Sequence, residues 1–588
     1  MVSMDRLKYP NPQQIRSDWM DLNGEWLTYF PENESDYFER PDRAQFTTTI
    51  QVPYSYTFKK SQSLQTDYQP VMWYCREFTM DLVDQQHQLL NFEAVDYQCS
   101  VWLNGVLVGS HVGGHTPFKI DVTPYLQKNN EIMIRVIDDN ATNQPIGKQK
   151  WKKDNFLCWY TRTMGIWQNV WLESTGAVYL DRLEMIPETH QDLLQIDASS
   201  NTVSAAMLDV TITYHDELIS HTMMSFRQGR VKQAIDVSSD DANFRLYYWS
   251  PDEPNLYDIE LKVVVDGRIT DDISSYFGMR DIKQNSGKIY LNDQELYQKL
   301  ILNQGYYSEG GLTGSADEMV ADINKIKEMG FNGHRIHQKI ESHRMLYLCD
   351  QLGLITWAEF PSNFSFSSQS VDNVLAELPA MVAKHINHPA VCVYVLMNES
   401  WGVNEIIQNQ KEQNFVNALY YQVKAYDNSR LVIGNDGWEQ TLTDICTVHD
   451  YNADSQDLLA SYQDKTVVVN GSPSQTSGRK VFCEGYATEK VPFIMSEYGG
   501  VAYETQHRQD SWGYGDRISS KTEVLERIQA LTQSVMNISF CTGFCYTQLT
   551  DVEQEVNGLL TANHEYKFNP EEIRKIMTKG QRRGFTFK

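Results

Sequence analysis

Two short apolar runs in the second half of the chain end abruptly in a glutamate. VCVYVLM leads into Asn398 and Glu399, and VPFIMS leads into Glu497. Uninterrupted apolar runs of this length are typical of parallel β-strands covered on both faces, because neither face of such a strand meets water. Parallel folds place their chemistry at the carboxyl ends of the strands. The two glutamates are therefore expected on a functional face.

From Gly287 onward, strand-like segments alternate with helix-like segments. Eight strand candidates follow one another: LYQKLILNQGYY, FNGHRIH, LITWAEF, AVCVYVLMNE, RLVIGNDG, TDICTVHDY, VPFIMSEYG and SFCTGFCYTQLTD. A capping box from Ser315 to Glu318 marks the start of the first helix, and Gly330 marks its end. Eight strands over roughly 300 residues predict a (β/α)₈ barrel in residues 284–588. A doubly wound open sheet is the alternative, but no glycine-rich nucleotide loop follows any strand.

The residues before the barrel read as antiparallel β-structure in two parts. Residues 1–177 alternate apolar and polar side chains, and Asn104-Gly105 is a dipeptide that favours a tight hairpin. Tryptophan is frequent there; some of the rings are expected to stack on sugars, but a role in the core is the simpler interpretation. Residues 178–283 hold strand-length runs separated by turn residues, which predicts an immunoglobulin-like β-sandwich.

The composition excludes several classes of partner. The formal net charge is −26 at pH 7, which disfavours nucleic acid and anionic membranes. The nine cysteines are scattered and never in C-x-x-C spacing, as expected for reduced thiols. The first residues, MVSMDRLKYPNPQQ, contain no apolar signal segment, and no apolar run approaches membrane-spanning length. We therefore expect a cytoplasmic protein.

Polar side chains follow every predicted barrel strand. They are Gln304, Tyr306, Arg335, His337, Glu359, Asn398, Glu399, Asn435, Asp436, His449, Asp450, Tyr451, Glu497, Gln548 and Asp551. Hydrolysis of a glycosidic bond needs one protonated carboxyl group and one ionised carboxylate. The apolar ring of Trp401 is expected to raise the pKa of Glu399, while Arg335 keeps a neighbouring carboxylate charged and Tyr451 donates a hydrogen bond to it. Spacing alone does not separate the roles of the two glutamates.

Other chemistries find less support in the sequence. His334 and His337 straddle a strand end, and no H-E-x-x-H motif occurs, so no catalytic metal is predicted. A Na⁺ or Mg²⁺ ion bound through carboxylates stays an alternative. No G-x-S-x-G elbow is present either.

Five separated stretches resemble glycoside hydrolase family 2, which includes β-galactosidases, β-glucuronidases and β-mannosidases. WMDLNGEW (19–26), VWLNGVLVGSHVGGHTPFKIDVT (101–123) and YTRTMGIWQNVWLE (160–173) resemble its N-terminal sugar-binding jelly roll. YYWSPDEPNLY (247–257) with FGMRDI (277–282) is similar to the end of its immunoglobulin-like domain. HPAVCVYVLMNESWG and PFIMSEYGG resemble its acid/base and nucleophile motifs.

The resemblance assigns roles that spacing could not. It implies that Glu399 is the acid/base, that Glu497 is the nucleophile, and that Asn398 holds the sugar 2-hydroxyl. Further substrate contacts are expected from Arg335, His337, Glu359, Trp401, Asp436, His449, Tyr451 and Gln548. The implied protein is a retaining exo-β-glycosidase, β-galactosidase-like, that needs no cofactor. By analogy its jelly roll could reach across a homo-oligomer interface.

The sequence also departs from the family pattern. RIHQKI replaces R-x-S-H-Y-P, NQGYYSEGG replaces N-R-H-E, and Tyr546 replaces a tryptophan. NHEYKF (563–568) lacks the glycine of the N-x-K-G motif of glucuronidases, which disfavours a glucuronide. The alternatives are β-glucuronidase or α-L-arabinopyranosidase specificity and, from another class, a non-catalytic carbohydrate-binding protein.

Overall fold

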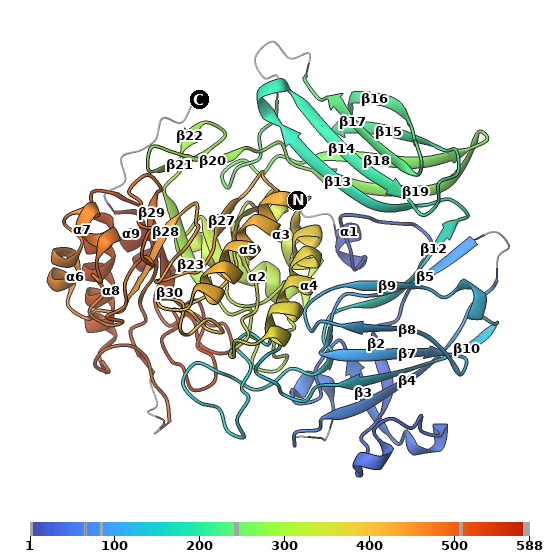
Figure 1. Ribbon diagram of the computed structural model, residues 1–588, viewed down its shortest axis with the longest axis horizontal. Coiled ribbons are helices and arrows are strands. Elements are labelled where there is room, and N and C mark those ends of the chain that lie inside the picture. The colour runs from blue at the N-terminus through green and yellow to red at the C-terminus, as the bar shows by residue number, and fades with distance from the viewer. Residues whose placement is uncertain are drawn as a thin grey trace.

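The chain folds into two β-sandwiches that lie against a barrel. The structure, a computed structural model, describes residues 4–63, 65, 67–82, 86–239, 246–504, 508 and 510–579. In Figure 1 the first sandwich is blue, the second is green, and the barrel runs from yellow-green to red. The predicted fold class, two sandwiches followed by a (β/α)₈ barrel, is confirmed.

The first sandwich consists of a six-stranded and a four-stranded antiparallel sheet. The larger sheet has the order β3-β2-β4-β10-β7-β8, formed by β2 (Gly24–Tyr29), β3 (Thr48–Val52), β4 (Val71–Thr79), β7 (Gln98–Leu103), β8 (Val106–Val112) and β10 (Asn129–Ile137). The smaller has the order β1-β12-β5-β9, formed by β1 (Trp19–Asp21), β5 (Gln86–Phe92), β9 (Phe118–Asp121) and β12 (Val170–Gly176). β6 (Val95–Asp96) pairs with β11 (Gly165–Ile166), and α1 (Met4–Lys8) precedes the sheets.

Alternation along these strands fills the space between the sheets. Trp26 and Tyr74 of the larger sheet and Leu90 of the smaller one belong to one buried cluster. The hairpin between β7 and β8 turns at Asn104 and Gly105, which both have positive φ (51° and 83°), as a type I′ turn requires.

The second sandwich has a three-stranded sheet, β13-β14-β17, and a four-stranded sheet, β16-β15-β18-β19. The strands are β13 (Leu180–Glu188), β14 (Leu193–Ser200), β15 (Met207–Tyr214), β16 (Glu217–Ser225), β17 (Arg230–Asp236), β18 (Tyr257–Val265) and β19 (Arg268–Phe277). Its buried cluster is separate from that of the first sandwich. A small antiparallel sheet, β20 (Ile282–Asn285), β21 (Lys288–Leu291) and β22 (Gln294–Glu295), leads into the barrel.

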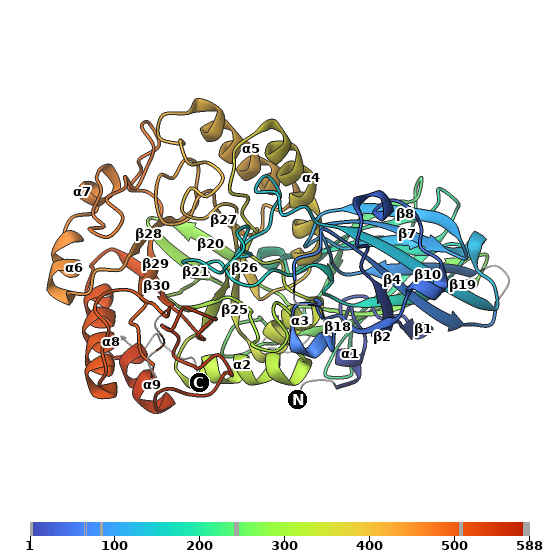
Figure 2. The same ribbon diagram turned by 90° about the horizontal axis from the view of Figure 1, so that it is seen from below.

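The barrel is a parallel sheet with the order β27-β26-β25-β24-β23-β30-β29-β28. All eight predicted strands are present: β23 (Gln298–Asn303), β24 (Gly333–Ile336), β25 (Ile355–Glu359), β26 (Val391–Val395), β27 (Leu431–Ile433), β28 (Cys446–Asp450), β29 (Phe493–Gly499) and β30 (Cys541–Thr547). The helices are α2 (Ala316–Glu328), α3 (His343–Leu352), α4 (Ser368–His385), α5 (Gln410–Tyr426), α6 (Ser455–Ser461), α7 (Lys465–Asn470), α8 (Lys521–Met536) and α9 (Pro570–Thr578). They form a ring around the strands in Figure 2.

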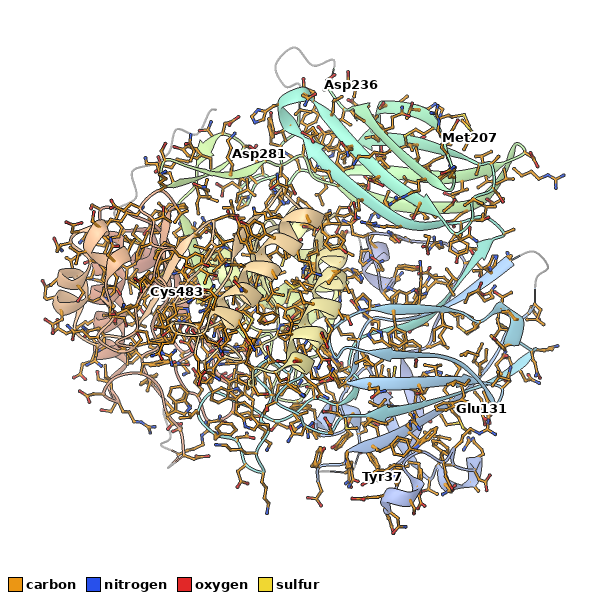
Figure 3. The ribbon with its side chains drawn as sticks, in the orientation of Figure 1. Tyr37, Glu131, Met207, Asp236, Asp281 and Cys483 are labelled. Carbon is orange, nitrogen blue, oxygen red and sulfur yellow. The ribbon has the colours of Figure 1, made fainter. Side chains whose placement is uncertain are left out.

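Burial explains the apolar runs of the barrel. Every residue of β26 and of β29 is buried, because core side chains fill the barrel on one face and helices cover the other. The predicted capping box is formed: the Ser315 side chain accepts from the Glu318 amide at the start of α2. All nine cysteines are free and most are buried, including Cys483, labelled in Figure 3. Among the described residues, none of the helices has the length and apolar character needed to cross a membrane.

One segment of the first sandwich crosses the mouth of the barrel. Residues 139–163, called the mouth segment below, leave β10 and run in teal across the strands in Figure 2. The Ile146 and Gly147 amides donate to Ser362 O (3.1 and 3.0 Å). Leu157 O accepts from Trp512 Nε1 (2.8 Å) on the other side of the mouth. The mouth segment therefore belongs to the barrel's functional face as well as to the sandwich.

Candidate active site

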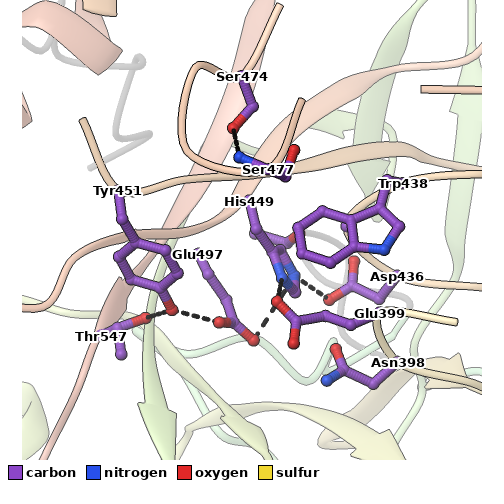
Figure 4. Close-up of polar contacts among 12 residues, drawn as sticks. Asn398, Glu399, Asp436, Trp438, His449, Tyr451, Ser474, Ser477, Glu497 and Thr547 are labelled. Carbon is purple, nitrogen blue, oxygen red and sulfur yellow. Dashed lines mark hydrogen bonds and ion pairs between the residues drawn. The ribbon is translucent and has the colours of Figure 1, made fainter. Parts of the chain in front are cut away.

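The barrel brings most of the predicted residues together at one face. Glu399 follows β26 and Glu497 lies in β29, on nearly opposite sides of the sheet order. His449 of β28 lies between them, as Figure 4 shows. One ligand atom from each of these three side chains lies within 4.8 Å of the other two. The two glutamates therefore face each other across a short gap.

Arg335 in β24 joins the strand ends into one network. Its Nε donates to Glu359 Oε2 (2.9 Å) and its Nη2 donates to Asn398 Oδ1 (2.7 Å). Its Nη1 donates to Glu497 Oε1 (2.7 Å) and lies 2.8 Å from Asp436 Oδ2. The guanidinium is 0% exposed. Burial would lower the Arg335 pKa, but the carboxylates of Asp436, Glu359 and Glu497 hold it well above its usual value.

Glu497 is held at both carboxylate oxygens. Oε1 accepts from Arg335, and Oε2 accepts from the hydroxyl of Tyr451. The Tyr451 hydroxyl also lies 3.1 Å from Thr547 Oγ1, and the Tyr451 ring stacks on Tyr514. These contacts fix the carboxylate and stabilise its charge, as the sequence predicted for Arg335 and Tyr451.

Glu399 is held in an uncommon backbone conformation. Its φ is 53° and that of Ser400 is 59°, both in the left-handed region. The Glu399 amide donates to Asp436 O (2.9 Å), and the Ser400 amide donates to Asn435 Oδ1 (3.0 Å). A non-glycine residue stays in this region only where its surroundings hold it there, and such residues gather at functional sites.

His449 controls the charge of Glu399. Its Nδ1 lies 2.8 Å from Glu399 Oε1, and its Nε2 lies 3.0 Å from Asp436 Oδ2. Burial would lower the pKa of His449, but the charges of Glu497 and Asp436 raise it to about 10. Burial would raise the pKa of Glu399, but the hydrogen bond and charge of His449 lower it to about 2. The one proton of this pair therefore resides on His449.

The expected rise of the Glu399 pKa beside Trp401 is wrong, because the pKa is lowered. Trp401 Nε1 donates to Glu399 Oε2 (3.2 Å), so the ring offers the carboxylate a polar N–H as well as an apolar wall. The hydrogen bond and charge of His449 outweigh the effect of burial and stabilise the ionised carboxylate. The sequence shows that Trp401 is near Glu399 but not that His449, fifty residues further on, lies closer.

The other predicted contacts surround this centre at different depths. His337 Nδ1 lies 3.0 Å from Glu359 Oε2, and burial holds the pKa of His337 well below its usual value, so its ring is neutral. Burial also raises the pKa of Glu359, against the opposing charge of Arg335, to about 7. Gln548 bonds to Gln304 and Asn557 rather than to either glutamate.

Two residues of the mouth segment reach the site without a sequence motif that marks them. The Trp159 ring lies edge to face on Trp401, with ring centroids 5.0 Å apart. Lys148 is half-buried beside it and interacts electrostatically with Glu399 and Glu555. Tryptophan is frequent throughout residues 1–177, so that signal neither distinguishes this segment nor gives a role to Lys148.

The donor set does not suit a cation. Glu399, His449 and Glu497 would have to supply the ligands, but His449 is protonated and donates to the neighbouring carboxylates. The guanidinium of Arg335 already forms ion pairs with Glu497 and Asp436. The second cluster, His190 with Asp281 and Asp293, is bound by Lys283.

Known proteins share this architecture along nearly the whole chain. Residues 282–579 match the family described as "Glycosyl hydrolases family 2, TIM barrel domain". Residues 12–175 match its sugar binding domain, and residues 178–280 match "Glycosyl hydrolases family 2". Together the three matches follow the order of the two sandwiches and the barrel.

The relatives differ in the sugar named for them. A beta-galactosidase of Thermoanaerobacter pseudethanolicus is 25% identical over 90% of this chain and 66% of its own length. A beta-glucuronidase of Mus musculus is 23% identical over 83% of this chain and 77% of its own. The chain spans 58% of a third relative, a putative beta-glucuronidase of Formosa agariphila.

Solved structures agree on the fold. A GH2 beta-galacturonidase from Eisenbergiella tayi superposes with a TM-score of 0.74 at 18% identity, covering 96% of this chain and 97% of that one. A beta-D-glucuronidase of Dictyoglomus thermophilum gives a TM-score of 0.76 at 18% identity, covering 97% and 98%. With a matching barrel that alone spans more than half of its residues, the chain belongs to glycosyl hydrolases family 2.

Proposed function

We propose that the protein is a retaining exo-β-glycosidase acting on β-galactosides. The observation that carries this proposal is the short gap between Glu399 and Glu497, whose facing oxygens lie within 4.8 Å. Retaining glycosidases hold their two carboxyl groups about 5–5.5 Å apart, whereas inverting ones leave about 6.5–9.5 Å for a water molecule. This gap leaves no room for a water molecule to attack between the two carboxyl groups, so one of them must act as the nucleophile.

Glu497 is the better nucleophile of the two. Arg335 and Tyr451 donate to its carboxylate oxygens and orient them, so one oxygen can attack the anomeric carbon as the glycosidic bond breaks. The product is a glycosyl ester on Glu497 and an aglycone whose oxygen needs a proton. Glu399, on the opposite side of the gap, is placed to deliver it.

The proton comes from the pair formed by Glu399 and His449. The charge of Glu497 is the first of the interactions that raise the His449 pKa, and esterification removes that charge. The His449 pKa therefore falls as the ester forms, and its proton moves through Glu399 to the leaving oxygen. In the second step Glu399 takes a proton from water, and the water oxygen attacks the anomeric carbon and releases Glu497 as a carboxylate. The restored charge of Glu497 raises the His449 pKa again, so the proton returns from Glu399 to His449.

The charge of the site favours a neutral sugar. Arg335, His449 and Lys148 carry three positive charges, and Asp436, Glu399 and Glu497 carry three negative ones. Glu359 and Glu555 can only add negative charge. A uronate would bring one more anion into a site without surplus cations, at a cost that low dielectric makes large.

One observation favours the second candidate, a β-hexuronide. Lys148 places an ammonium group at the mouth, and a carboxylate of the substrate could bind it. Relatives named beta-glucuronidase and a structural neighbour named beta-galacturonidase fit this alternative. An α-L-arabinopyranoside has the same ring and hydroxyl arrangement as a β-galactoside but lacks the C6 group. Its turnover therefore shows whether the enzyme needs that group.

A panel of nitrophenyl glycosides separates these functions. We expect the β-galactoside to give the highest kcat/KM, with the β-anomer of the sugar as the first product in proton NMR. Preferred turnover of a uronide would reassign the specificity, and an α-anomer formed first would exclude retention. Sugar binding with no hydrolysis of any glycoside would favour a carbohydrate-binding protein.

Substitution of the nucleophile tests the chemistry itself. Glu497→Gln should abolish turnover and leave thermal unfolding close to that of the wild type, because the amide keeps the shape of the side chain. Glu405→Gln, an exposed carboxylate after Trp401, serves as the control and should retain full activity. Substantial turnover by Glu497→Gln would contradict the assignment.

We also propose a cytoplasmic enzyme that needs neither cofactor nor metal and has no nucleic-acid partner. Nine free thiols and the charge of −26 support this placement. Dialysis against a chelator should leave turnover unchanged. A homo-oligomer, suggested by analogy, is tested by light scattering.

A further inference from the structure

A small pocket with several buried polar groups in its lining lies between the mouth segment and the barrel. The mouth segment contributes Lys148 and Tyr160, and the barrel contributes Gln304, His337 and Gln338. The cavity has a volume of about 10 Å³, enough for one water-sized group. The ring of His337 connects it to the site, because the other side of that ring is bound to Glu359.

A chain of amides fixes the orientation of Gln304. A carboxylate only accepts hydrogen bonds, so Asn557, which is bonded to Glu555 Oε1, must present Nδ2 to it (2.9 Å). Asn557 Oδ1 then accepts from Gln548 Nε2 (2.7 Å), and Gln548 Oε1 accepts from Gln304 Nε2 (2.9 Å). The amide nitrogen of Gln304 is thereby used, and its oxygen is left at the end of the chain.

The lining of the pocket holds buried amide groups without partners. Gln304 is 5% exposed and its Oε1 has no hydrogen-bond partner among the described residues. Gln338 is 2% exposed, has a φ of 50°, and neither polar atom of its side chain is bonded to the described residues. A buried amide oxygen without a partner is costly, so the pocket is incomplete without a ligand or water.

The pocket also offers a donor. No carboxylate oxygen among the described residues lies within 4.0 Å of Lys148 Nζ, although the charges of Glu555 and Glu399 act on it from further away. The thiol of Cys158 engages the ammonium, which has three N–H donors and can therefore also donate to an oxygen in the pocket. A ligand that satisfies both sides must accept from Lys148 and donate to Gln304 Oε1.

We propose that this pocket binds a hydroxyl group of the sugar and makes Gln304 and Lys148 determinants of specificity for neutral glycosides. This inference rests on the proposed glycosidase function and narrows its substrate class. A hydroxyl donates and accepts at once, so it satisfies the ammonium and the amide oxygen together. A carboxylate only accepts, and it would face the fixed oxygen of Gln304 with no proton between them.

Monodeoxy substrates test the proposal directly. We would measure kcat/KM for nitrophenyl β-galactoside and for its 2-, 3-, 4- and 6-deoxy analogues, with the wild type and with Gln304→Leu. In the variant, kcat/KM for the galactoside should fall by about 10- to 100-fold, the range expected when a buried hydrogen bond is removed. For the one analogue that lacks the bound hydroxyl, kcat/KM of the variant should lie within about twofold of that of the wild type.

Two lysine variants complete the test, one in the pocket and one as a control. Lys148→Met should show the same pattern with the same analogue. Lys152→Met, which removes an ammonium that lies over the Phe156 ring in the same segment, should change none of these rates. If Gln304→Leu unfolds, Lys148→Met decides the question.

Several outcomes would overturn the inference. Equal losses on all five substrates would mean that the pocket holds a structural water and no substrate hydroxyl. Preference of the wild type for a uronide would also overturn it, while leaving glycosidase function intact. Inactivity of the wild type toward every glycoside would overturn the proposed function and this inference with it.

Discussion

His449 Nδ1 lies 2.8 Å from Glu399 Oε1, and this pair shares one proton that resides on the imidazole. The pKa of His449 is raised to about 10 and that of Glu399 is lowered to about 2, so the pair keeps one proton over a wide pH range. An acid catalyst of this kind does not need a carboxyl group that is itself protonated at neutral pH. It needs a neighbouring group, here His449, whose pKa falls during the reaction.

The first prediction concerns the pH profile of His449→Asn. Without the imidazole, burial dominates and the pKa of Glu399 rises, while the store of protons near pH 10 disappears. The basic limb of kcat/KM should therefore move down by several pH units. A substrate with a dinitrophenyl aglycone, which leaves without a proton, should show little change in its glycosylation rate. An unaltered basic limb with nitrophenyl substrates would exclude His449 as the proton store.

The second prediction concerns the hydrogen bond from Tyr451 to Glu497. Tyr451→Phe removes a donor to a buried carboxylate, and such bonds contribute about 1.5–3 kcal/mol, so kcat should fall by about 10- to 100-fold. Tyr462→Phe is the control, because Tyr462 donates to Asp450 Oδ2 (2.9 Å) and not to either glutamate. If both variants lose the same activity, the effect is structural and not specific to Glu497.

The third prediction concerns Gly147, where the mouth segment approaches the barrel. Its φ is 60°, and a Cβ there would lie 2.3 Å from Gln338 O. Gly147→Ala should push the segment away from the site and lower kcat/KM by about 10-fold or more, with a loss of about 2–3 kcal/mol in unfolding free energy. Gly478→Ala is a close control, because Gly478 has a φ of 61° and no atom within 4 Å of the added methyl group. The unfolding free energy of this control should fall by only about 1 kcal/mol, and its activity should be unchanged.

The sequence predicted the barrel well because its signal is local. Each strand is an apolar run buried on both faces, and each run ends in the polar residues that the fold brings together, such as Arg335, Glu399 and Glu497. The register of these ends follows from the parallel pairing of neighbouring strands. The positions of the two glutamates could thus be inferred without any knowledge of side-chain contacts.

The rest of the site depends on contacts between distant segments. Lys148 and Trp159 come from another domain, and nothing in their own neighbourhood shows that the chain there crosses the barrel mouth. The orientation of Gln304 depends on Glu555, which follows it by some 250 residues. The expectation for Glu399 failed for the same reason, because Trp401 is its neighbour in sequence and His449 is its neighbour in space.

The last prediction concerns the dependence of stability on pH between about pH 4 and pH 8. Asp96 of the sandwich accepts from Gln149 Nε2 (2.8 Å), and Glu377 of α4 accepts from the Tyr97 hydroxyl (2.9 Å). Burial raises the pKa of each carboxyl group to about 8. Each group also has one oxygen without a hydrogen-bond partner among the described residues. Both side chains are therefore buried in the protonated state.

The sign of the effect follows from the two states of the chain. In the unfolded chain these groups release their protons near pH 4, whereas in the folded protein they keep them to about pH 8. The folded state therefore binds more protons between these values, and stability falls as the pH rises through this window, by up to about 1.4 kcal/mol per pH unit for each group. Urea unfolding at pH 6 and pH 9 measures the fall. Glu377→Gln cannot ionise at this position. Its free energy of unfolding at pH 6 should be equal to or lower than that of the wild type, but it should fall less between pH 6 and pH 9. Glu565→Gln, an exposed carboxylate, should leave the slope unchanged, and an equal slope in Glu377→Gln would exclude Glu377 as its source.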